Sequence, residues 1–175
     1  PVQTDNLYRT ALEFADITPG ETLWDLYCGI GTISLFIAKE LGSAGEVIGV
    51  EIVPEAIENA KENARRNGIT NARFYAGAAE EVVPKLIAAD GVESAKADVV
   101  VVDPPRKGCD QTLLDTIIRM SPNRIVYVSC DPATLARDVK VLAAKGYEVK
   151  KVRTCDMFPM GGHVETVVGL QRKDM

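Results

Sequence analysis

Four consecutive valines, Val99 to Val102, constrain the fold of this 175-residue chain more than any other feature. A run that is apolar on both faces of a strand has to be covered from both sides. A central strand of a parallel sheet, with helices on each face, meets that requirement. Similar short apolar runs recur along the chain and alternate with helical patterns. This alternation predicts a doubly wound α/β domain.

The predicted elements alternate up to residue 145, and an amphipathic helix over 4–15 precedes them. We expect strands at 22–26, 47–51, 72–75, 98–102 and 125–129, and helices at 32–41, 55–67, 80–89, 111–120 and 133–145. The tail differs, because the strand-like runs 148–153 and 164–170 leave no room for a helix between them. These two runs are predicted to form an antiparallel pair at one edge of the sheet.

The composition is that of one ordinary globular domain, with 46% hydrophobic and 26% charged residues. No apolar run approaches the roughly 20 residues of a membrane span, so we expect no membrane partner. The four cysteines form no C-x-x-C pair, and neither a zinc site nor a disulfide framework is predicted. We therefore expect a reduced, cytoplasmic, monomeric protein without a bound metal.

The charge distribution is uneven along the chain. The net charge of −5 does not favour nucleic acid, but residues 106–153 carry ten Lys or Arg against five Asp or Glu. This stretch is either a set of ordinary solvated helix faces or a basic side of the domain that suits a polyanion.

A glycine-containing turn follows the first predicted strand, in the run Asp25-Leu26-Tyr27-Cys28-Gly29-Ile30-Gly31-Thr32. Glycines at this point let the backbone turn tightly and approach a ligand at a helix N-terminus. Glu51 closes the second strand, at the position from which a carboxylate binds ribose hydroxyls. Gly29, Gly31 and Glu51 together predict a site for a nucleoside cofactor.

The residues around the glycines distinguish between cofactors. A dinucleotide fingerprint has a third glycine where this chain has Ser34. Asp25 instead gives the pattern D-x-x-x-G-x-G, which resembles motif I of the Rossmann-like S-adenosylmethionine-dependent methyltransferases. A carboxylate here suits a cofactor with a sulfonium and an amine, and it would repel a pyrophosphate.

Cys130 lies where the last strand of the alternating part gives way to a helix, in the run Ser129-Cys130-Asp131-Pro132. Asp131 can serve as the N-cap and Pro132 as the first helical residue. A thiol just before the positive end of a helix dipole is held more readily as the nucleophilic thiolate. The alternative is a small apolar residue that closes a buried strand.

Three motifs together identify a family. The first is Asp103-Pro104-Pro105-Arg106-Lys107-Gly108, the second is Ser-Cys-Asp-Pro-Ala-Thr-Leu-Ala-Arg-Asp over 129–138, and the third is Asp156-Met157-Phe158-Pro159 leading to His163-Val164-Glu165. With them the chain resembles, over essentially its whole length, the RNA (uracil-5-)-methyltransferase family, which makes 5-methyluridine in ribosomal or transfer RNA.

The resemblance implies a fold and a set of roles. The fold is a Rossmann-like class I methyltransferase domain, with a mostly parallel seven-stranded sheet, an antiparallel strand at its C-terminal edge and helices on both faces. Cys130 is implied to be the nucleophile that adds to carbon 6 of uracil, and Glu165 the base that removes the carbon-5 proton. Tyr27, Glu51 and Asp103 are implied to contact S-adenosylmethionine, whose product is S-adenosylhomocysteine.

The expected partner is an RNA, with 23S ribosomal RNA favoured over transfer RNA. Arg106, Lys107 and Arg137 are candidates for phosphate contacts, and capping roles suit them equally well. His163 either orients Glu165 or is a structural histidine.

Two departures from the family bear on these expectations. The chain lacks the upstream F-x-Q-V-N segment, the small RNA-binding β-barrel and the iron–sulfur cluster that members can carry. Residues 1–175 are therefore expected to be a single catalytic domain from a longer enzyme. Ala78 stands where some relatives place an amide near adenine, so adenine contacts are expected from the backbone.

Two other functions remain open. One is a Rossmann-like methyltransferase with a different acceptor, which would leave Cys130 without a role. The other is a non-catalytic module that binds S-adenosylmethionine.

Overall fold

A computed structural model of the chain describes residues 2–90, 97–158 and 163–174. The helices are α1 (Val2–Ala15), α2 (Thr32–Leu41), α3 (Pro54–Arg66), α4 (Ala79–Asp90), α5 (Gln111–Met120) and α6 (Pro132–Ala144), with a short 3-10 helix, η1, at Gly42–Ala44. The strands are β1 (Thr22–Asp25), β2 (Glu46–Glu51), β3 (Ala72–Ala76), β4 (Val99–Val102), β5 (Arg124–Ser129), β6 (Tyr147–Phe158) and β7 (His163–Arg172).

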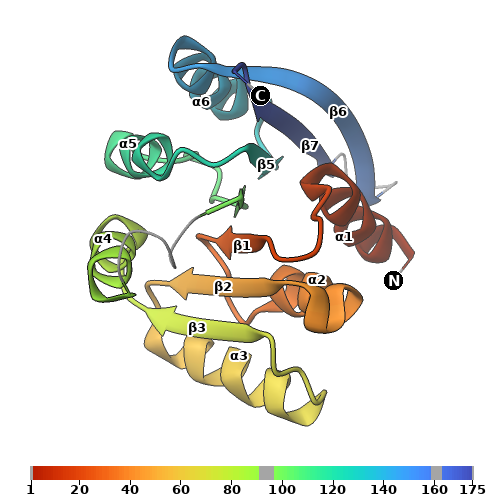
Figure 1. Ribbon diagram of the computed structural model, residues 1–175. Coiled ribbons are helices and arrows are strands. Elements are labelled where there is room, and N and C mark those ends of the chain that lie inside the picture. Colours follow the sequence, from red (N-terminus) through yellow and green to blue (C-terminus); the bar gives the residue numbers. More distant parts are fainter. Residues whose placement is uncertain (1, 91–96, 159–162, 175) are drawn as a thin grey trace.

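The strands form one seven-stranded sheet in the order β3-β2-β1-β4-β5-β7-β6 (Figure 1). Strands β1 to β5 are parallel to their neighbours. The last strand of the chain, β7, is inserted between β5 and β6 and is antiparallel to both. The order reverses direction at β1, so the strand ends beside β1 and β4 form the crevice where ligands bind in sheets of this kind.

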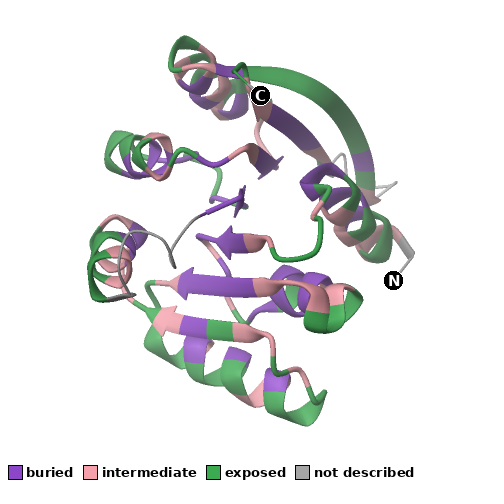
Figure 2. Ribbon diagram, viewed as in Figure 1, coloured by how far each residue is buried: buried purple, intermediate pink, exposed green. Residues whose placement is uncertain are grey.

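Helices cover both faces of the sheet (Figure 1). Helices α4, α5 and α6 pack on one face, on Trp24, Leu26 and the even-numbered valines of β4. On the opposite face, α1 and α2 pack on Leu23 and the odd-numbered valines, and α3 packs around Phe74. Each of the four β4 valines is fully buried, and Figure 2 shows the buried residues concentrated in the sheet and on the helix sides that face it.

The predicted elements and fold class are confirmed. Helices α2 and α5 have the predicted bounds, and the other helices and the strands of the alternating part differ by one or two residues at an end. The antiparallel pair at the C-terminal edge is also confirmed, but β6 and β7 are longer than predicted, at 12 and 10 residues. Among the described residues, no helix has the length and apolar character needed to cross a membrane.

Candidate active site

The predicted site residues gather at one edge of the sheet, where the parallel strands end. Tyr27 lies two residues beyond the end of β1, Glu51 is the last residue of β2, and Asp103 and Cys130 directly follow β4 and β5. Because these four strands are parallel, their carboxyl ends meet at the same edge.

The glycine turn after β1 is bound to the end of β2. The N–H of Gly29 donates a hydrogen bond of 3.2 Å to Oε1 of Glu51, and the N–H of Val53 donates one of 3.0 Å to Oε2. Gly31, the N-cap of α2, has φ 86°, and a Cβ at this position would lie 3.1 Å from the side chains of Ala60 and Phe74. Glycine is therefore required at residue 31 both for the backbone conformation and for the close packing.

Asp25 is buried beneath this turn, with 1% of its surface exposed. Its Oδ2 accepts a hydrogen bond of 2.7 Å from the hydroxyl of Ser34. Burial, aided by the charge of Glu51, raises the pKa of Asp25 to about 6, although the hydrogen bond from Ser34 opposes this change. The serine in place of a third dinucleotide-binding glycine thus anchors the carboxylate that distinguishes this turn.

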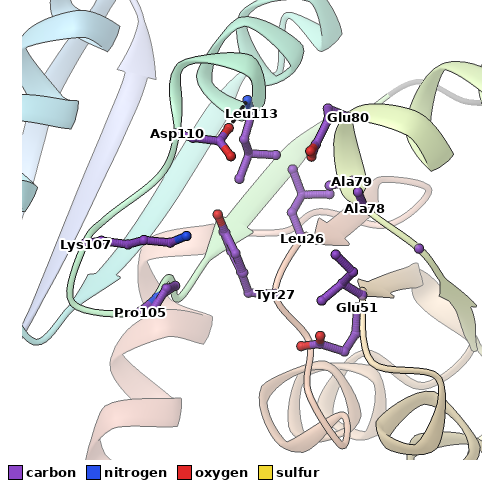
Figure 3. A pocket seen from close by; sticks show the side chains of 12 residues that line it. Leu26, Tyr27, Glu51, Ala78, Ala79, Glu80, Pro105, Lys107, Asp110 and Leu113 are labelled. Carbon is purple, nitrogen blue, oxygen red and sulfur yellow. Dashed lines mark hydrogen bonds between the residues drawn. The ribbon is translucent and has the colours of Figure 1, made fainter.

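A pocket of about 360 Å³ opens beside Tyr27 and Glu51. Figure 3 shows Glu51 at one end, the carboxylates of Glu80 and Asp110 at the other, and the Tyr27 ring between them. Burial and then the neighbouring Cys109 and Asp110 raise the pKa of Tyr27. The apolar lining includes Leu26, Ile52, Ala78, Ala79, Pro105 and Leu113.

Glu80 and Asp110 are pocket residues that the sequence reasoning missed. Asp110 is the N-cap of α5 and accepts from the N–H of Leu113, and Glu80 lies in the first turn of α4. Acidic residues are favoured at helix N-termini in any case, so their sequence positions gave no separate signal of a site. Ala78 lines the same pocket as these two carboxylates, and the expectation that adenine contacts near Ala78 come from the backbone stays a prediction.

The strand register brings Cys130 and Glu165 together, although 35 positions separate them in the sequence. In the antiparallel pair of β5 and β7, Ser129 lies opposite Thr166. This is the last pair of the ladder; Cys130 directly follows Ser129 and Glu165 directly precedes Thr166, so the two residues flank this pair on the same side. On its other side Glu165 lies opposite Cys155 of β6. Both Cys130 and Glu165 are partly accessible to solvent.

The turn that carries Cys130 is fixed on both sides. The hydroxyl of Ser129 donates to the carbonyl of Asp131 at 2.9 Å and accepts from its N–H at 3.0 Å. Asp131 caps α6 as predicted, since its Oδ1 accepts from the N–H groups of Ala133 at 2.9 Å and Thr134 at 3.2 Å. The thiol therefore stands directly before a capped helix N-terminus.

Asp103 links the two halves of the site. Its side chain keeps contact with solvent, yet loss of hydration at this concave edge, followed by the charges of Asp25 and Glu165, raises the pKa of Asp103 to about 7. Asp103 is thus within electrostatic reach of both Asp25, beneath the glycine turn, and Glu165 of β7. Burial, followed by the charge of Asp103, raises the pKa of Tyr8 in α1. Tyr8, which the sequence did not single out, is therefore a further residue near Asp103.

The remaining predicted residues divide into structural and undescribed ones. Cys28, Cys109 and Cys155 are buried and, like Cys130, unpaired. Arg137 makes hydrogen bonds within the protein, to the carbonyls of Lys107 and Cys109. Pro159, the glycines at 161 and 162 and the side chain of His163 lie outside the part of the chain that the structure describes.

Comparison with known proteins agrees with this geometry. A model of the tRNA (uracil-5-)-methyltransferase family matches residues 6–173. The chain belongs to this family. Uncharacterized RNA methyltransferases of Clostridium acetobutylicum and Halalkalibacterium halodurans are 55% and 57% identical to it over 174 residues, which is 99% of this chain and 36% of each relative. The chain thus spans about a third of the length of these relatives.

A solved structure of the same family has the same fold. The Pyrococcus abyssi tRNA (uracil-54, C5)-methyltransferase, in complex with S-adenosyl-L-homocysteine, is 37% identical, with a TM-score of 0.77 over 94% of this chain and 37% of that one. The family predicted from the three motifs is therefore confirmed.

We predict that replacing Asp103 by Asn stabilises the protein at alkaline pH. The raised pKa means that the folded state holds this proton more tightly than the unfolded state, so the contribution to stability is complete below about pH 4 and is lost as the pH rises through 7. After allowance for solvent screening, the free energy of unfolding of Asp103→Asn should gain about 1 kcal/mol on wild type between pH 4 and pH 8.

Urea unfolding at the two pH values measures this difference. Asp115→Asn is the matched control, because Asp115 is an exposed carboxylate whose contact is with Gln111 on its own helix. An equal change in both variants would contradict the electrostatic coupling at the strand ends.

Proposed function

We propose that this domain transfers a methyl group from S-adenosylmethionine to carbon 5 of a uridine in RNA, through a covalent bond between Cys130 and carbon 6 of uracil. The observation that supports the proposal is the β5–β7 register, in which Cys130 directly follows and Glu165 directly precedes the last paired residues, Ser129 and Thr166. Asp103 lies within electrostatic reach of Glu165. A nucleophile and a base near the same uracil ring are what the reaction requires.

The pocket beside Glu51 suits S-adenosylmethionine. Glu51 lies at the end of β2, where a carboxylate can accept from ribose hydroxyls, and Glu80 and Asp110 offer acceptors to an exocyclic amine at the far end. Asp25 and Asp103, whose pKa values burial raises to about 6 and about 7, would be stabilised as carboxylates by a cationic ligand. The complex of the Pyrococcus abyssi relative with S-adenosyl-L-homocysteine supports this assignment.

The bound cofactor supplies an electrophilic methyl group and leaves as S-adenosylhomocysteine. Cys130 makes carbon 5 nucleophilic, because its thiolate forms a bond to carbon 6 and sends the ring electrons toward the C4 carbonyl as an enolate. Carbon 5 then takes up the methyl group. Glu165 removes the remaining carbon-5 proton, the carbon 5–carbon 6 double bond returns, and the bond to sulfur breaks.

We propose 23S ribosomal RNA as the acceptor; the three sequence motifs support a uridine in RNA and do not distinguish ribosomal from transfer RNA. Transfer RNA is the second candidate, because the Pyrococcus abyssi relative is named for uracil 54 of tRNA. We also propose that the enzyme acts as a monomer. We further propose that residues 1–175 are its catalytic domain, and that segments such as those in the longer relatives supply much of the RNA affinity.

Replacing Glu51 by Ala should weaken binding of S-adenosylhomocysteine by one to two decades. The change removes a charge-assisted contact with the ribose, worth about 1.5–3 kcal/mol, together with the acceptor that holds the Gly29 amide. Isothermal titration calorimetry measures the affinity, and NAD should bind poorly to wild type. Glu55→Ala removes the same charge from the first turn of α3 and should bind like wild type. Equal affinities for Glu51→Ala and wild type would refute the assignment of the pocket.

The two catalytic residues should fail at different stages of the reaction. Cys130→Ala should form neither a covalent RNA complex nor product, because no bond to carbon 6 can form. Glu165→Gln should still allow attack and methylation, and should then remain attached to the RNA because the carbon-5 proton stays in place. Denaturing gels of the protein at its natural length, mixed with S-adenosylmethionine and either ribosomal or transfer RNA, should show a slowly migrating band for Glu165→Gln.

Cys155→Ala is the control, since Cys155 faces Glu165 from β6 and is buried. This variant should retain both adduct formation and turnover. Loss of activity in Glu165→Gln without a trapped complex would instead assign Glu165 to positioning or structure.

A further inference from the structure

The loop after β4 is fastened to helix α6 by side chains of a single helical turn. The hydroxyl of Thr134 donates to the carbonyl of Arg106 at 2.9 Å. Nη2 of Arg137 donates to the carbonyls of Lys107 at 2.7 Å and Cys109 at 3.2 Å. Three hydrogen bonds to main-chain carbonyls, of residues 106, 107 and 109, thus hold the loop by its backbone and do not depend on the loop's own side chains.

Asp138 completes this attachment from inside the protein. It is fully buried, and its Oδ2 accepts from the N–H of Cys109 at 2.8 Å and from the hydroxyl of Tyr127 at 2.6 Å. Its Oδ1 accepts from Nε of Arg137 at 3.0 Å. A buried carboxylate is tolerated only when its acceptors are satisfied in this way.

Gly108 shows how closely the loop approaches the helix. Its φ is +75°, and a Cβ at this position would lie 2.6 Å from both Nη2 of Arg137 and Oδ2 of Asp138. A side chain at residue 108 would separate the loop from its attachment points, so the glycine of the D-P-P-R-K-G motif and the Arg-Asp pair at the end of the S-C-D-P-A-T-L-A-R-D motif depend on each other.

The two ends of this attachment carry the two halves of the proposed site. The loop begins at Asp103, and its Pro105 and Lys107 line the pocket beside Glu51. Helix α6 begins at Pro132, two residues after Cys130. A rigid helix that holds the loop therefore sets the position of the cofactor pocket relative to the thiol.

We propose that Thr134, Arg137 and Asp138 are positioning residues, which hold the Asp103–Cys109 loop at the distance from Cys130 that methyl transfer requires. The proposal rests on the proposed function of Cys130 and the pocket. It assigns Arg137 to the geometry of the site and not to an RNA phosphate. A misplacement of about 1 Å between reacting groups lowers a rate by on the order of 100-fold, so loosening the loop should reduce turnover more than binding.

Arg137→Lys separates the two roles of Arg137. Lysine keeps the charge that a phosphate contact needs, but it cannot reproduce the fork that bonds two carbonyls and Asp138 at once. The expected result, in the protein at its natural length, is a fall in kcat of about 10- to 100-fold with the KM for RNA within about twofold of wild type. Thr134→Val, which removes only the hydroxyl that holds Arg106, should change kcat in the same direction.

Lys140→Gln is the matched control for Arg137→Gln, because Lys140 is exposed on the same helix and both replacements remove one positive charge. This variant should keep the wild-type kcat. Wild-type kcat in Arg137→Lys, or an Arg137→Gln variant that mainly weakens RNA binding and reduces its salt dependence by about one unit of slope, would assign Arg137 to a phosphate contact and overturn the proposal.

Amide hydrogen exchange tests the attachment without any activity. Peptides that cover residues 103–110 should exchange faster in Arg137→Lys and in Thr134→Val than in wild type and Lys140→Gln, while peptides of α3 exchange equally in all four. Unchanged exchange in the loop would overturn the proposal even in an active enzyme. If the loop exchanges faster in these two variants but the wild-type protein methylates no uridine, the attachment of the loop is supported and the proposed function is refuted.

Discussion

The insertion of β7 between β5 and β6 is the constraint on which the candidate site depends. The register of an antiparallel strand pair is strongly specified, because a slip of one residue would turn every side chain of the strand to the other face of the sheet. With Ser129 opposite Thr166 as the last pair, Cys130 and Glu165 come directly beside that pair at the carboxyl edge of the parallel strands. That register is held by the buried side chains of both strands, among them Tyr127, Val167 and Val168. Core packing thus determines which residues are neighbours at this edge of the sheet.

Electrostatics at the same edge oppose the stability of the fold. Asp25, Glu51, Asp103 and Glu165 converge there, and the pKa values of Asp25 and Asp103 are raised to about 6 and about 7 by burial and by neighbouring carboxylates. Such an arrangement costs the free protein stability at neutral pH. Binding of a cationic ligand would offset this cost, because the ligand would stabilise the carboxylates. Groups with perturbed pKa values are common at functional sites for this kind of reason.

Sequence periodicity predicted nearly all of the secondary structure, because the central strands are apolar on both faces and the helices on one. Local patterns also predicted the glycine turn, the N-cap at Asp131 and the thiol before α6. The family resemblance supplied Glu165 as a candidate base, since nothing local marks a carboxylate on a strand as catalytic.

Features that depend on long-range packing could not be predicted. Glu80, Asp110 and Tyr8 reach the site from three different helices, and each has an ordinary place in its own helix. The attachment of the Gly108 loop by Arg137 and Asp138 joins residues about 30 positions apart. In the sequence, Arg137 and Asp138 cannot be distinguished from the residues of an ordinary polar helix face. Arg137 was a candidate phosphate contact for that reason.

The central claim is that Cys130 forms a covalent bond with the uracil ring, and RNA containing 5-fluorouridine tests it most directly. Fluorine at carbon 5 cannot be removed as a proton, so the wild-type protein at its natural length should be trapped after methyl transfer. Mass spectrometry of the digested complex should find the modified nucleotide on the peptide that contains Cys130, with one added methyl group. Absence of an adduct, when the same protein methylates the unmodified RNA, or attachment to Cys155 in place of Cys130, would contradict the account.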